Sequence, residues 1–277
     1  MIPKAKRSMF FQQPSESPYD LRFSLLGFRT RIAWGFWLIA VLLGYNLARD
    51  VDWMFRGDSP GTLPLLVIWA GCIAASILIH ELGHTIAFRA FGIDASILLY
   101  HFGGLAIPTG TRHAFYQIGR PGSLNHVQEL IVAAAGPALQ IGSALLLTAG
   151  VWWFGYRIDA YWLMPGPIAD ATAPLHSDAL LQPSATGFAV VNFYVLPSIL
   201  WGLLNLVPVL PLDGGRIAQS LIGLCGGDTL QARWLGVIMA IIIAVYAFRA
   251  GQHYLAIFFV WMGIENYQAT QAGSSWR

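Results

Sequence analysis

Long apolar runs alternate with short polar stretches along most of the chain. A helix of about 17 to 25 apolar residues is long enough to cross a bilayer. The pattern predicts about six transmembrane helices, at 32–48, 63–90, 129–154, from 187 to the prolines near 208, 234–248 and 254–264. The stretch 96–108 is too short to span, is rich in strand-forming residues and contains a Gly-Gly pair. This composition favours a membrane-associated β-hairpin, and an ordinary interfacial loop is the alternative.

Polar segments divide the chain. Residues 1–31 are basic and rich in Pro, Ser and Gln, so we expect a cytoplasmic, interfacial N-terminal segment. A six-span domain at 32–267, with its core at 63–216, and a C-terminal tail at 268–277 follow. Pro208 and Pro211 must interrupt the fourth helix, and a broken helix at membrane depth is tolerated where it lies within protein or lines a cavity.

Composition supports a membrane protein. Hydrophobic residues make up 56% of the 277 residues and charged residues 11%, and the mean hydropathy is +0.57, whereas soluble domains carry about 25% charge. The expected fold is an all-α polytopic membrane protein with the short hairpin after its second helix. No basic stripe with interleaved aromatic residues is present, so nucleic acid is excluded as a partner.

The sequence H-E-L-G-H at 80–84 carries the clearest chemistry. On one helix, His80 and His84 lie one turn apart on the same face and can bind one metal ion. Zinc is the metal that this spacing favours, with Glu81 placed to take a proton from water. Core histidines beside a stray glutamate are the alternative, but polar groups set in an apolar run are costly unless they are functional.

A catalytic zinc usually has three protein ligands. We expect Asp213 to be the third ligand of a single zinc per chain, because it follows the proline-broken span and precedes Gly214 and Gly215, which allow close approach. A turn or a helix N-cap is the other interpretation of P-L-D-G-G.

Together, H-E-L-G-H at 80–84 and N-L-V-P-V-L-P-L-D-G-G at 205–215 resemble the site-2 protease family of M50-type intramembrane zinc metalloproteases. F-G-G at 102–104 and A-G-P at 135–137 are similar to two further motifs of that family. The pattern without PDZ or CBS domains is similar to its compact members. The resemblance implies zinc on His80, His84 and Asp213, and Glu81 as the residue that activates water.

The resemblance also implies that a transmembrane protein substrate is cut inside the lipid bilayer. Its unwound segment would add to the hairpin at Gly103 and Gly104. Asn205 would hold the substrate backbone or the oxyanion, although a hydrogen bond between helices is nearly as good an account. Gln140 stands where the family commonly has Asn, and its amide could polarise the scissile carbonyl.

Two other functions compete with this one. A pseudoprotease would bind transmembrane segments without cutting them, and a metal enzyme acting on lipid would need further histidine clusters. We expect a multi-pass protein of the bacterial inner membrane. Twelve of the 16 Lys and Arg residues fall on one side when both termini are cytoplasmic, as the positive-inside rule favours.

Overall fold

The computed structural model describes residues 14–101, 103–111, 124–163, 169–170 and 180–274. Residues 1–13 of the predicted N-terminal segment, Phe102 of the F-G-G motif and residues 275–277 of the predicted tail lie outside this part. The long helices are α1 (Trp34–Met54), α2 (Thr62–Ala90), α3 (His126–Trp153), α5 (Ala185–Asn205), α7 (Thr229–Arg249) and α8 (His253–Ser274), with a shorter α6 (Asp213–Leu224) and the 3-10 helix η2 (Asp159–Leu163). The strands are β1 (Leu21–Leu25), β2 (Phe28–Ile32), β3 (Ile93–Tyr100) and β4 (Gly103–Thr111).

All six predicted helices are present, and four of them are long and apolar enough to cross a membrane, namely α2, α3, α5 and α7. The chain is therefore an integral membrane protein. The predicted break is also present: α5 ends at Asn205, α6 begins at Asp213, and both prolines lie between them.

The fold is mostly helical, but the all-α assignment missed a four-stranded sheet of order β1-β2-β3-β4. The predicted hairpin forms β3 and β4. The prediction for 1–31 was incomplete, because residues 21–32 are a second hairpin whose β2 pairs in parallel with β3, with Thr30 opposite Ile97. Successive side chains of a strand point to opposite faces, and every second side chain of β2 is buried: Phe28, Thr30 and Ile32 are each 2% exposed. One face of β2 is therefore covered by protein.

Polar contacts fix this N-terminal hairpin. Arg89, at the end of α2, donates to the Leu26 carbonyl at 3.0 Å and lies 3.5 Å from the ring centre of Phe28. Asp20 accepts hydrogen bonds from the backbone N–H groups of Ser17 and Trp34 and from the Arg31 guanidinium. The Ser17 bond is the main reason why the pKa of Asp20 lies below its usual value.

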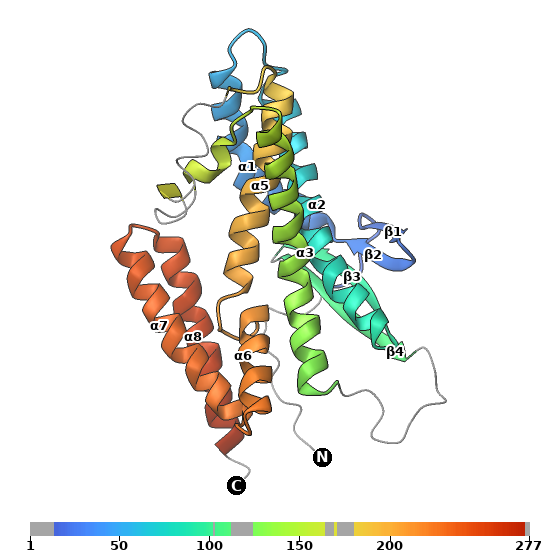
Figure 1. Cartoon of the computed structure of the whole chain (residues 1–277), viewed down its shortest axis with the longest axis vertical. Helices are drawn as coiled ribbons and strands as arrows, with labels where there is room; N and C mark the ends of the chain where they lie inside the picture. Colours follow the sequence, from blue (N-terminus) through green and yellow to red (C-terminus); the bar gives the residue numbers. More distant parts are fainter. Residues whose placement is uncertain (1–13, 102, 112–123, 164–168, 171–179, 275–277) are drawn as a thin grey trace. The chain divides into compact units, whose positions relative to one another are not determined.

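The chain divides into two compact units. Of the described residues, one unit contains 14–101, 103–110, 138–163, 169–170 and 180–202, and the other contains 111, 124–137 and 203–274. In the first, β2, β3, α1 and α2 share a core around Phe36, Ile77 and Leu99. In the second, α7 and α8 lie side by side (Figure 1). Residues 206–212, between α5 and α6, form the proline segment, and its Val209 packs with Phe259 and Met262 of α8.

Candidate metal centre

Helix α2 carries the histidine pair and the glutamate into the protein interior. His80, Glu81 and His84 are 3%, 4% and 6% exposed, so none is a solvent-facing residue. The Nε2 atoms of the two histidines face each other at 3.1 Å. Two nitrogens bound tetrahedrally at 2.0–2.1 Å to one zinc would be about 3.3 Å apart. The pair is therefore already close to the geometry of two ligands on one ion.

Asp213 is the first residue of α6 and is 7% exposed. The two glycines that follow it fit a space that is closed by backbone. A Cβ on Gly214 would lie 2.1 Å from the Leu206 carbonyl oxygen, and a Cβ on Gly215 would lie 2.5 Å from the Leu210 nitrogen. Glycine is thus required here by packing, and it brings the start of α6 directly against the proline segment.

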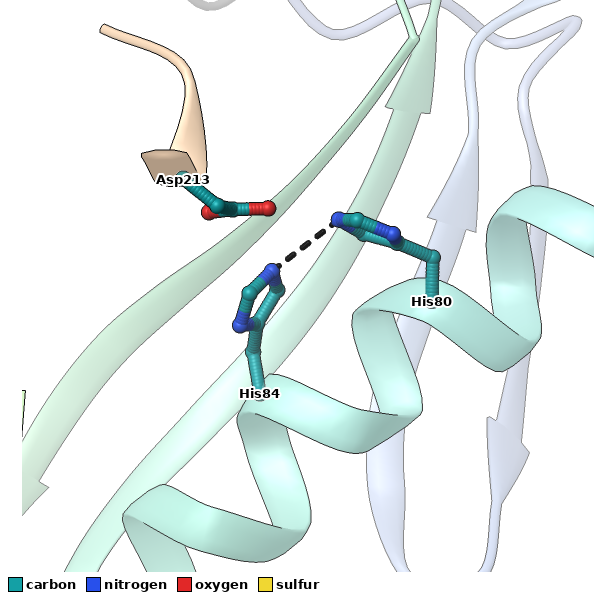
Figure 2. Close-up of side chains that lie close together, drawn as sticks. All are labelled: His80, His84 and Asp213. Carbon is teal, nitrogen blue, oxygen red and sulfur yellow. Dashed lines mark hydrogen bonds between the residues drawn. The ribbon is translucent and has the colours of Figure 1, made fainter. Parts of the chain in front are cut away.

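One ligand atom from each of His80, His84 and Asp213 lies within 4.8 Å of the others. Figure 2 shows the Asp213 carboxylate directed toward the two imidazole rings. Two imidazole nitrogens and one carboxylate oxygen are the donor set of a catalytic zinc site, which leaves a further coordination position for water or substrate. The residues present therefore fit this metal.

Glu81 lies against strand β4. A Cβ on Gly104 would come 2.3 Å from Glu81 Oε1 and 2.7 Å from its Cδ, so only glycine leaves room for this carboxylate. Gly103 has a φ of 126°, and a Cβ there would lie 2.8 Å from the Trp201 ring. The sequence singled out both glycines for substrate contact, and the structure additionally gives each a steric reason.

The remaining predicted residues occupy different settings. Asn205 is 8% exposed and ends α5, where its predicted substrate role stays a prediction. Gln140 is 0% exposed on α3, and its Oε1 lies 2.9 Å from His80 Nδ1. Its Nε2 donates to Ser76 Oγ at 2.9 Å. Sequence reasoning missed Ser76 and its neighbour Ser198, because small polar residues within apolar helices carry no distinctive local pattern.

Comparison with known proteins finds a matching family and several similar sequences. The profile of peptidase family M50 matches residues 68–248. The putative zinc metalloprotease Rip3 of Mycobacterium tuberculosis is 28% identical over 221 residues, which is 75% of this chain and 44% of that protein. The putative zinc metalloprotease sll0528 of Synechocystis is 30% identical over 186 residues, 67% of this chain and 38% of that protein. The chain thus spans less than half the length of these relatives.

A site-2 protease from Methanocaldococcus jannaschii has a solved structure that is 19% identical, with a TM-score of 0.45 over 91% of this chain and 95% of that one. The family assignment depends on the profile match, which covers well over half of the chain and includes both H-E-L-G-H and the L-D-G-G sequence. This chain belongs to peptidase family M50.

Proposed function

We propose that the chain is a zinc-dependent intramembrane endopeptidase, which hydrolyses peptide bonds within or near transmembrane segments of membrane proteins. His80, His84 and Asp213 would hold one zinc ion per chain. The observation that carries the proposal is the buried His80-Glu81-His84 set on a membrane-type helix, with the two Nε2 atoms 3.1 Å apart, in a chain of family M50.

Zinc bound there would supply a Lewis acid for the scissile carbonyl and would make a water molecule more acidic. Glu81 is the general base in this proposal. It precedes His84 by less than one turn, so its carboxylate stays close to the ligands, and Gly104 leaves it the space to do so. Glu81 takes the proton of the attacking water and passes it to the leaving amine, after which it is again a carboxylate.

The sheet offers a place for the substrate. A transmembrane helix satisfies its own backbone, so a peptide bond can be reached only after the segment is unwound, and the exposed N–H and C=O groups then need new partners. Strand β4 is the last strand in the sheet order and begins with Gly103 and Gly104 beside Glu81. We propose that the unwound segment adds to β4 as a strand, with Asn205 holding its backbone or the oxyanion.

We also propose that α1 and α8 are spans, which gives six in total with both termini cytoplasmic. Each has more than 20 residues, and both carry exposed large apolar side chains, such as Leu42 of α1 and Ile257 of α8. In intact cells, a cysteine replacing Asp58 should react with a membrane-impermeant maleimide. The exposed Cys225 should react only after permeabilisation. The reverse pattern would contradict this orientation.

The function is tested with Glu81→Gln. Epitope-tagged single-span reporters would be co-expressed with the chain, one with an all-leucine span and one with Gly-Pro at mid-span. We expect the wild type to cut the Gly-Pro reporter more, because its helix unwinds more easily. Glu81→Gln should abolish cleavage while zinc content and melting temperature stay unchanged. Glu129→Gln, the same exchange on α3 at a half-exposed position, is the matched control.

Undiminished cleavage by Glu81→Gln would refute the proposal. A wild type that binds zinc and captures the reporters, yet cuts neither of them, would support the pseudoprotease instead. Cleavage of an ester-linked lipid by the wild type, abolished by the same variant, would point to the lipid-acting enzyme.

A further inference from the structure

Gln140 belongs to a buried chain of polar groups that crosses three helices. From His80 Nδ1 on α2, the chain passes through the Gln140 amide on α3 to Ser76 Oγ, at 2.9 Å for each contact. Ser198 Oγ on α5 lies 2.8 Å from Ser76 Oγ and 2.6 Å from the carbonyl oxygen of Tyr194. His80 is 3% exposed, and Gln140, Ser76 and Ser198 are all 0% exposed, so water does not compete for these contacts.

The contacts at Ser76 set the direction of the Gln140 amide. The amide nitrogen donates to Ser76 Oγ, which also accepts the hydroxyl proton of Ser198. The amide oxygen therefore faces His80 and accepts a proton from its Nδ1.

The opposite amide orientation would turn the amide NH₂ group toward His80 Nδ1. Nδ1 would then carry the lone pair and Nε2, which faces His84, would carry the proton. That tautomer could not bind a metal through Nε2, so the orientation of the amide selects the tautomer that can.

We propose that Gln140 is a positioning residue for the metal ligand His80, which it holds with the proton on Nδ1 and the lone pair on Nε2. The inference rests on the proposed function, since it takes His80 as a zinc ligand. It gives Gln140 a task that differs from polarising the scissile carbonyl. Both sides of its amide are engaged inside the helix bundle, so the amide acts through the imidazole ring.

Loss of such a partner typically weakens metal binding by about 10- to 100-fold. The experiment measures zinc affinity by chelator competition in purified protein, and the absorption spectrum with Co²⁺ as a probe of ligand geometry. All variants carry Glu81→Gln as well, so proteolysis plays no part in the readout. Gln140→Met keeps the length of the side chain and removes both hydrogen bonds.

Two further variants make the result specific. Gln140→Glu in its protonated form offers a carbonyl to His80 and an O–H to Ser76, so it should restore zinc affinity to within about tenfold of the parent. Thr148→Val is the matched control, because it removes a hydroxyl of α3 that bonds Tyr161 at 2.9 Å without reaching His80. We expect the control to keep the affinity and the Co²⁺ spectrum of the parent.

Parent-like zinc affinity and an unchanged Co²⁺ spectrum in Gln140→Met would overturn the inference. An equal loss in Thr148→Val would do so too, because the effect would then be general loosening of α3. If Gln140→Met does not fold, Ser76→Ala decides: it removes only the anchor of the amide and should weaken zinc binding severalfold, and unchanged binding refutes the proposal.

The inference and the proposed function fail in different ways. A parent protein that binds no zinc would refute the function. A parent that binds zinc, with Gln140→Met binding it equally well, would refute only the positioning role. A residue that contacts the oxyanion would instead lower kcat in the Glu81-containing enzyme and leave zinc affinity unchanged.

Discussion

A buried side-chain amide supports each half of the proposed metal centre, but the two amides act at different places. Gln140 contacts the ligand His80 itself at 2.9 Å. Asn266, on α8, donates from Nδ2 to the Leu210 carbonyl at 2.7 Å, which lies in the proline segment before Asp213. The histidine half is therefore oriented through a side chain, whereas the aspartate half is placed through its backbone.

The glycines of the two halves show the same difference. A Cβ on Gly104 would meet the movable end of the Glu81 side chain, whereas a Cβ on Gly214 would meet backbone atoms of Leu206 and Val207 at 2.1–2.4 Å. A side chain can rotate away, but the backbone that leads into Pro208 is restricted by the proline and cannot. Substitutions in the histidine half should thus lower the rate of the reaction, and substitutions in the aspartate half should lower the stability of the fold.

The largest effect is expected for Gly214→Ala. Overpacking against backbone costs about 3 kcal/mol or more when nothing can move, so the variant should lose zinc and melt well below the wild type. Thermal melting in detergent and zinc content are the measurements. Gly142→Ala, a glycine of α3 with open space around it, is the control and should melt no lower than the wild type. A wild-type melting curve for Gly214→Ala would remove the distinction between the halves.

Gly104→Ala should act on the reaction and leave the fold intact. The added methyl group displaces the Glu81 carboxylate, and an error of about 1 Å in a catalytic group can cost about 100-fold in rate. We expect reporter cleavage to fall by about that factor, with zinc content and melting temperature retained. Gly142→Ala again controls for the addition of a methyl group. Loss of zinc together with activity would mean that β4 supports the ligands as well.

Asn266→Leu should have a moderate effect, on the stability of the fold and not on the reaction. It removes the bonds to Leu210 and to the Met262 carbonyl, at 2.7 and 2.8 Å, and each such bond contributes about 1 kcal/mol. The melting temperature should fall by a few degrees, and zinc affinity should fall less than in Gln140→Met. A larger loss of affinity than in Gln140→Met would show that the backbone route is the more important one.

The smallest effect is expected for Asp20→Asn, at the start of the N-terminal hairpin. The folded state lowers the pKa of Asp20, so the bound carboxylate stabilises the protein above about pH 4 and this contribution is lost as the pH falls through the folded pKa. The variant should melt about 2 °C lower at pH 7, and the difference should disappear in acid. Zinc affinity should be unchanged, and a change would show that the sheet edge is coupled to the ligands.

Local patterns explain which features could be predicted. The spacing of His80, Glu81 and His84 needs only a helix, and Pro208 and Pro211 end one wherever they occur. The pairing of β2 with β3 is different, because Thr30 and Ile97 are far apart in sequence and either strand alone is compatible with a surface segment.

Gln140 shows a second reason why the sequence alone predicts only part of the site. Its place after A-G-P favoured contact with substrate, and that role stays a prediction. Its bond to His80 depends on how three helices pack, and Ser76 and Ser198 become partners only through that packing. Residues whose contacts are made across helices carry little signal of those contacts in their own sequence neighbourhood.

The parallel pairing of β2 with β3 also constrains the order of assembly. During synthesis, β2 leaves the ribosome before α1 and α2, and its partner β3 follows only after both helices. Two strands alone are barely stable in water, so the first hairpin gains its lasting neighbour late. The sheet that is proposed to receive the substrate, and with it the strand beside Glu81, is therefore completed only after the helix that carries His80 and His84 has been made, and before Asp213 leaves the ribosome.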